Sequence, residues 1–208
     1  MAIKKRPTPP NCDYEPIVGD VDDISFGIVE ATGDPPRRLE DVILKRTYPT
    51  ERPADLSGGW PAFTADPVAV LLPKGAPDHF SSIRYLCDAY HSKPGNQIEH
   101  LAAQITIRFP GVDDVPQRLR LHEARELGRG FAQRLASKLQ AAAVFCMHIP
   151  AVSWGHGVPH SHIVIPARLV LSGSGFGRFI PALVNAEEGR AMVDAEWISW
   201  TQENGYDL

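Results

Sequence analysis

Apolar residues recur at three- and four-residue steps over positions 116–140 of this chain, and this periodicity limits the folds that the chain can adopt. It predicts a long amphipathic helix, which must bury its apolar face against another layer of structure. Two apolar segments, 142–149 and 161–167, follow the helix and have the length of strands. The fold must therefore combine helices with a sheet. The apolar stripe of the helix consists of Ala124, Leu127, Phe131, Leu135 and Leu139.

Shorter patterns elsewhere predict further strands and helices. A mixture of this kind, with a hairpin near its C-terminal half, is typical of an α/β or α+β protein with a mainly antiparallel central sheet flanked by helices. Residues 1–20 are rich in proline and polar residues, and we expect a flexible N-terminal tail there, followed by one domain over 21–208. The other elements are expected as strands at 24–30, 68–72 and 104–109, and as helices at 39–48, 79–91 and 184–203.

The composition is that of a globular protein. Hydrophobic residues make up 43% of the chain and charged residues 22%, which is enough apolar material for a core. No apolar run is long enough to cross a membrane, and the basic start leads into no apolar stretch of the secretory type. Cys12, Cys87 and Cys146 are scattered, which indicates reduced thiols rather than a disulfide framework. We therefore expect a cytoplasmic protein.

A cluster of histidines lies between positions 148 and 162. His160 and His162 are two residues apart, so on a strand their side chains share one face. His148 ends the preceding predicted strand and can approach both rings if the two strands pair. Three neutral imidazoles on one rigid surface form a site for a divalent metal whose remaining coordination positions are open to water or substrate. A metal held in that way can polarise a phosphoryl oxygen.

Histidines on strands and loops also occur without any ligand, hydrogen-bonded to the backbone. That interpretation is favoured for an isolated His-x-His pair, whereas a third histidine on the neighbouring strand favours a metal. His156, in the predicted connecting loop, is interpreted as solvated; a fourth ligand or a DNA contact are the alternatives.

Several segments between about 68 and 200 follow one another in an order typical of one family. They are VAVLLPKGAP (68–77), AAQITIRFP (102–110), EARELGRGFAQRLA (123–136), VPHSHIVIPAR (158–168) and SGSGFGRF (172–179). In the same order they resemble ILLPEGAP, a helix-to-strand passage, the helix after it, NPHAHVMLTTR and a glycine-containing stretch of the MobA/MobL-type relaxases. These relaxases belong to the HUH endonuclease superfamily.

The resemblance implies a nucleophilic tyrosine in a helix that follows the first strand. The matching position is Tyr48, in ILKRTYPTE. This chain departs from the family pattern because Tyr48 is followed by proline and lacks the small residues that precede the family's tyrosine. The alternative is a surface tyrosine that closes a short helix. Tyr90 and Tyr85 are the other candidates, although the helix that carries them has a structural counterpart in the family.

The resemblance also implies a mechanism. His148, His160 and His162 would hold Mg²⁺ or Mn²⁺ at the scissile phosphate of single-stranded DNA. Attack by Tyr48 would leave a 5′-phosphotyrosyl link and a free 3′-hydroxyl. The assisting base is sought at Asp41 or Glu40. Backbone phosphates are expected to be held by Arg168 and Arg178.

The implied function is DNA nicking and strand transfer in plasmid mobilisation and conjugative transfer. Single-stranded DNA at an origin of transfer is the expected substrate, and accessory mobilisation proteins are the expected partners. The net charge of −4 and the pI near 6.0 oppose this function, because proteins that hold DNA by its phosphates are usually basic. Two alternatives remain. One is a non-catalytic DNA-binding or regulatory remnant of the relaxase fold, and the other is a metal hydrolase that uses an activated water.

Overall fold

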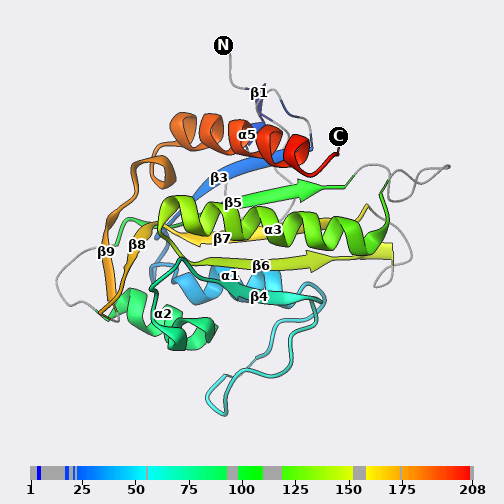
Figure 1. Ribbon diagram of the computed structural model, residues 1–208. Helices are drawn as coiled ribbons and strands as arrows, with labels where there is room; N and C mark the ends of the chain where they lie inside the picture. The colour runs from blue at the N-terminus through cyan, green and yellow to red at the C-terminus, as the bar shows by residue number, and fades with distance from the viewer. Residues whose placement is uncertain are drawn as a thin grey trace.

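The fold is built on an antiparallel sheet with helices on both faces (Figure 1). The computed structural model describes residues 4–5, 17–18, 21, 23–54, 56–92, 98–109, 119–151, 158–173 and 175–206. The strand order is β1-β2-β3-β5-β7-β6-β4, and every neighbouring pair is antiparallel. The strands are β1 (Lys4–Lys5), β2 (Ile17–Val18), β3 (Ile24–Glu30), β4 (Val68–Leu71), β5 (His100–Arg108), β6 (Ala143–His148) and β7 (His160–Pro166).

Each face of the sheet is covered by its own helices. On one face lie α3 (Leu121–Leu139) and α5 (Ala186–Glu203). On the other lie α1 (Leu39–Thr47), the 3₁₀ turn η1 (Asp78–Ser81) and α2 (Ile83–His91). In Figure 1, α3 crosses in front of the sheet and α1 lies behind it.

Alternation along the strands produces the two layers of the core. Phe145 and Ile163 pack with α3, whereas the adjacent Val144 and Val164 pack with α1 and α2. The inner strands β6 and β7 are therefore apolar on both faces over most of their length. This arrangement confirms the predicted class, an α+β fold with an antiparallel central sheet flanked by helices.

The long helix begins at Leu121, later than the predicted start at 116. Residues 116–118 lie outside the part of the chain that the structure describes. Arg120 is extended, and its backbone N–H donates to the Glu123 carboxylate at 2.8 Å, which caps the first turn. The helix ends at Leu139 and is capped by Gln140, whose φ of 51° is left-handed.

Close packing joins α5 to α3. The indole N–H of Trp200 donates to the Leu127 carbonyl at 3.0 Å. The indole ring lies against Gly130, where an added Cβ would fall 2.5 Å from the Trp200 ring. The two helices can therefore approach this closely only because residue 130 has no side chain.

Other predicted elements differ from the structure at their ends. The predicted helix over 79–91 is interrupted at Ser82, which separates η1 from α2. The predicted strand over 104–109 begins earlier, at His100. The last helix begins after Asn185, because the side chain of Asn185 accepts hydrogen bonds from two backbone N–H groups of its first turn. The residues before it, Pro181–Leu183, form a 3₁₀ turn, η2.

The predicted tail over 1–20 lies largely outside the described residues. Its described parts, β1 and β2, extend the sheet beyond β3. The tail therefore stays a prediction. Across the helices of the described segments, none has the length and apolar character needed to cross a membrane.

A separate hairpin follows β7. It consists of β8 (Arg168–Leu171) and β9 (Gly175–Phe179), which pair with each other and not with the main sheet. Phe176 stacks on Phe80 and meets the edge of Tyr90, with ring centroids 5.4 and 5.0 Å apart, so the hairpin is held against η1 and α2. Figure 1 shows this hairpin at one end of the sheet, while the arrowheads of β5 and β6 point to the other end.

Candidate metal centre

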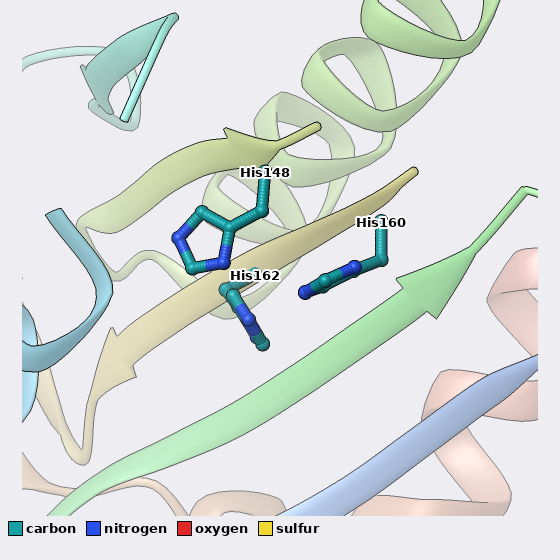
Figure 2. Close-up of side chains that lie close together, drawn as sticks. All are labelled: His148, His160 and His162. Atoms are coloured by element: carbon teal, nitrogen blue, oxygen red, sulfur yellow. The ribbon is translucent and has the colours of Figure 1, made fainter. Parts of the chain in front are cut away.

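Three histidine rings converge at the end of the sheet where β6 finishes and β7 begins (Figure 2). The register pairs His148 with His160 and Cys146 with His162, so all three imidazoles lie on the face of the sheet that carries α1. Ring centroids are 4.7 Å apart for His148 and His162, 5.0 Å for His160 and His162, and 5.1 Å for His148 and His160. One nitrogen of each ring lies within 4.8 Å of the other two. The strands thus pair as the sequence predicts, and the histidine cluster can bind a divalent metal.

Hydrogen bonds orient two of the rings. The Nε2 of His148 lies 2.6 Å from the carbonyl oxygen of Arg46, and the Nδ1 of His160 lies 2.9 Å from that of Val158. A carbonyl only accepts, so these two nitrogens carry the hydrogens. The lone pairs that remain for a metal are therefore on Nδ1 of His148 and Nε2 of His160.

His162 has two partners at one nitrogen. Its Nδ1 lies 2.9 Å from the Thr106 hydroxyl and 3.1 Å from the amide nitrogen of Gln104. If Nδ1 donates to Thr106, Nε2 is left with a lone pair; if Nδ1 accepts from Gln104, Nε2 carries the hydrogen. A metal bound through Nε2 selects the first tautomer, with Thr106 as the acceptor.

The cluster is held in its neutral form. The pKa of His148 is lowered to about 4, chiefly by burial and also by the nearby His160 and Arg46, although the hydrogen bond to the Arg46 carbonyl opposes the shift. Burial also lowers the pKa of His160, and it lowers that of His162 well below its ordinary value. Neutral imidazoles are the form that binds metals, so the site is ready to coordinate at pH 7.

Two arginines lie beside the histidines. Arg108 is directly opposite His160 in the pairing of β5 with β7. Arg46, in the last turn of α1, donates from Nε to the Gln104 amide oxygen at 3.3 Å. Both cations lower the pKa values of His160 and His162 through their charge. Although the chain as a whole is acidic, this end of the sheet is locally basic and suits an anionic group such as a phosphate.

The polar residues of β5 that surround the histidines are not predicted as site residues by the sequence, although their alternation with apolar residues is visible in it. Gln104, Thr106 and Arg108 alternate with apolar residues along one predicted strand, so they share a face. The alternation predicts a half-buried strand, but it does not predict which strand lies next to it. Only the sheet order, with β5 next to β7, places that polar face beside His160 and His162.

Tyr48 closes α1, two residues after the carbonyl that meets His148. Only 5% of the residue is exposed. Its hydroxyl donates to the Pro61 carbonyl at 2.6 Å, and its ring meets the edge of Phe63 with centroids 5.6 Å apart. Burial raises the pKa of the phenol. The Tyr48 backbone is thus close to the metal centre, while its hydroxyl is engaged by the 60–63 loop; its role as nucleophile stays a prediction.

The other residues predicted for the site lie elsewhere. Arg168 is buried, donates to the Gly177 carbonyl at 2.8 Å and lies over the Phe179 ring at 5.2 Å. Arg178 is exposed on β9 of the same hairpin. The six-residue step from His162 to Arg168 corresponds to about 20 Å of extended chain, and the structure does not bring either arginine to the histidines. Contacts of Arg168 and Arg178 with DNA remain predictions.

The remaining candidates have structural partners or are not described. Tyr90 is buried and its hydroxyl donates to the His100 carbonyl, whereas Tyr85 is exposed. Glu40 and Asp41 lie in the first turn of α1, at the opposite end of that helix from Tyr48. Burial alone would raise the pKa of Asp41, but hydrogen bonds and charge from Arg52 and Arg38 lower it. His156 lies outside the described residues.

Comparison with known proteins identifies the fold. No family model matches the chain, and no curated protein has a significantly similar sequence. A solved structure from work on the molecular basis of vancomycin resistance transfer in Staphylococcus aureus is similar, with a TM-score of 0.59 and 18% sequence identity. The match covers 89% of this chain and 94% of the other. At this identity the likeness establishes a shared fold.

Proposed function

We propose that this chain is a metal-dependent nuclease of the relaxase type, which nicks single-stranded DNA at an origin of transfer and transfers the cut strand during plasmid mobilisation. The observation that carries the proposal is the convergence of three neutral histidines beside Arg46 and Arg108. The structural neighbour, which comes from work on resistance transfer, supports the same class of function. Accessory mobilisation proteins are the partners that this function calls for.

The histidines fit a divalent metal. Two of the three rings have their spare lone pair fixed by a carbonyl partner, and the third reaches the same state through Thr106. Ligand nitrogens on one small metal ion lie within about 4 Å of one another, given bonds of about 2.1 Å. The observed limit of 4.8 Å requires only a small closure of the rings. A bound Mg²⁺ or Mn²⁺ would neutralise charge on the phosphate oxygens.

The side chains of this protein would hold and attack the phosphate. Arg46 and Arg108 would bind the non-bridging oxygens of the scissile group. The Tyr48 oxygen would form a new bond to phosphorus while the bond from phosphorus to the 3′ oxygen breaks. The phenolic proton would pass to water, and the departing 3′ oxygen would take up a proton. For this attack the Tyr48 hydroxyl must leave the Pro61 carbonyl, which a rotation of its side chain or a shift of the 60–63 loop would allow.

The hydrogen bond from the Tyr48 hydroxyl to the Pro61 carbonyl favours a second candidate function. This candidate is a non-catalytic DNA-binding or regulatory protein that has kept the fold. A buried tyrosine with a satisfied hydroxyl and a raised pKa is stable where it lies. The overall negative charge points in the same direction. A nuclease that uses water as nucleophile would keep the histidines and need no tyrosine.

One experiment separates these functions. Labelled single-stranded oligonucleotides, including origin-of-transfer sequences, are incubated with Mn²⁺ and run on a denaturing gel. We expect a covalent protein–DNA band with the wild type that is lost in Tyr48→Phe and His160→Ala. The matched controls are Tyr206→Phe and the exposed His122→Ala, which should keep the band.

Two other results of this gel would support the water-dependent nuclease or the binding protein instead. Cleavage that survives in Tyr48→Phe but not in His160→Ala indicates water as the nucleophile, and the same gel for Tyr85→Phe and Tyr90→Phe tests those tyrosines. Tight binding of the oligonucleotide without any cleavage contradicts the nuclease and supports the binding protein.

A further inference from the structure

A cavity lies at β4, the edge strand of the sheet. Its volume is about 240 Å³, and it is bounded by the 60–63 loop, the edge strand β4 and the junction of η1 with α2. Since β4 pairs with β6 and Val68 is opposite Cys146, the strand that lines the cavity is the immediate neighbour of the strand that carries His148.

The lining combines three kinds of side chain. Trp60 and Phe63 provide aromatic faces, with ring centroids 6.3 Å apart at 89°. Aliphatic groups of β4 and Ile83 also line it, together with Ser81 and Ser82. Arg84, which is exposed, is the only charged residue among the described residues that line the cavity. A largely apolar cavity with two serines and one cation suits an aromatic ring attached to an anion.

The aromatic wall is continuous with the proposed site of attack. The Phe63 ring contacts the Tyr48 ring, and the Tyr48 hydroxyl is bound to the Pro61 carbonyl in the same loop. The Arg46 carbonyl, two residues before Tyr48, is bound to His148. An unbroken series of contacts therefore links His148, through the end of α1, to the 60–63 loop that forms the cavity. These contacts place the aromatic wall of the cavity directly against Tyr48, the candidate nucleophile.

We infer that this cavity binds one unpaired nucleobase of the single-stranded DNA next to the scissile phosphate. Because the two rings are perpendicular, the base stacks on one of them, Trp60 or Phe63, and meets the edge of the other. Arg84 binds the phosphate attached to that nucleotide. The inference rests on the proposed function, because it takes the strand to lie at the histidines.

The test compares two oligonucleotides of equal length and charge, oligo(dT) and its fully abasic analogue, by fluorescence anisotropy without cleavage. The wild type should bind oligo(dT) more tightly. In Trp60→Ala that preference should fall by about 5- to 150-fold, the range for one stacked base. The affinity for the abasic chain should change little. The matched control Trp60→Phe keeps an aromatic face and should keep most of the preference. Arg84→Gln should weaken the binding of both oligonucleotides alike.

A second measurement does not depend on the variants. Oligonucleotides with 5-iodouracil at single positions are photo-crosslinked to the wild type, and the adducts should map to Trp60 or Phe63. Equal base preference in wild type and Trp60→Ala, or adducts elsewhere, would overturn the inference while leaving the Mn²⁺ cleavage assay to decide the nuclease. Base preference without cleavage would keep the cavity and refute the nuclease. If no single-stranded DNA binds, both fail.

Discussion

The Nε2 of His148 donates to the carbonyl oxygen of Arg46 at 2.6 Å, and this bond joins the last turn of α1 to the end of β6. It fixes the ring of a candidate metal ligand and at the same time fixes the backbone two residues before Tyr48. One ring of the metal centre and the backbone next to the candidate nucleophile therefore share this hydrogen bond. Disturbing either partner should affect both.

Thr106→Val should weaken the binding of metal. Without the hydroxyl, Nδ1 of His162 keeps only the Gln104 amide as partner and accepts from it, so Nε2 carries the hydrogen and cannot coordinate. Loss of a partner of this kind typically costs about 10- to 100-fold in metal affinity. Titration calorimetry with Mn²⁺ measures the change, with the exposed Thr50→Val as control. Unchanged affinity would show that Thr106 does not set the tautomer.

The metal-free protein should lose stability as the pH falls from about 6.5 toward 4. Burial lowers the folded-state pKa of His148 to about 4 from its ordinary 6.5, so below pH 6.5 the unfolded chain binds a proton that the folded chain resists. The stability from this residue is complete above pH 6.5, and its loss by pH 4 amounts to roughly 3 kcal/mol. His160 and His162, with pKa values lowered in the same direction, add to it.

Urea unfolding with a chelator at several pH values measures this effect. His148→Asn should flatten the dependence on pH, whereas the exposed His122→Gln should leave it unchanged. A free energy of unfolding that stays constant from pH 7 to 4.5 would contradict the burial of a neutral cluster.

Two glycines should be intolerant of alanine because of what surrounds them. At Gly189 an added Cβ would fall 2.2 Å from the Ala182 carbonyl oxygen and 2.3 Å from the Phe26 ring, so backbone must move. At Gly130 it would meet only the Trp200 ring, at 2.5 Å. We expect Gly189→Ala to lower the free energy of unfolding by about 1–3 kcal/mol, and Gly130→Ala to lower it by less. Gly58→Ala, with nothing within 4 Å, is the control for chemical denaturation.

The arginines beside the histidines should contribute to DNA binding through phosphate. Replacing Arg108 or Arg46 by glutamine should weaken the binding of single-stranded DNA and reduce the slope of log affinity against log salt by about 0.7 for each lost contact. Their affinity for Mn²⁺ should not fall, because a neighbouring positive charge is removed. Arg178→Gln in the same salt titration tests the DNA contact predicted from the sequence. If the slope changes in Arg178→Gln but not in the Arg46 and Arg108 variants, the DNA binds at the β8–β9 hairpin and not at the histidines.

The three histidines of the metal centre could be predicted from the sequence, whereas the polar residues around them could not. The alternation of side chains along a strand is local, so the common face of His160 and His162 follows from their spacing alone. His148 joins them because consecutive strands paired, which is the usual outcome. The contact of Gln104 with His162 spans 58 residues and depends on which strands are neighbours, and no local pattern encodes that order.

For Tyr48, the candidate nucleophile, the sequence predicts the position in the fold but not the contact of the side chain. The position of Tyr48 at the end of α1 could be predicted from helix spacing, and the structure agrees. The partner of its hydroxyl is a carbonyl in an irregular loop, and irregular backbone has no periodicity from which a contact can be inferred. Arg168 is similar: its burial against Gly177 and Phe179 follows from a hairpin that the sequence patterns did not reveal.

The three histidines all belong to one pair of adjacent strands, whereas Tyr48 belongs to a helix 100 positions earlier in the chain than His148. The bond that joins the two parts uses the backbone carbonyl of Arg46, so selection can change the side chain at position 48 while that bond is kept. A related protein can have another residue at position 48, or a tyrosine covered by a loop, and still keep the three imidazoles in the same arrangement. Relatives with the same histidines and different chemistry at position 48 are the natural outcome of that independence.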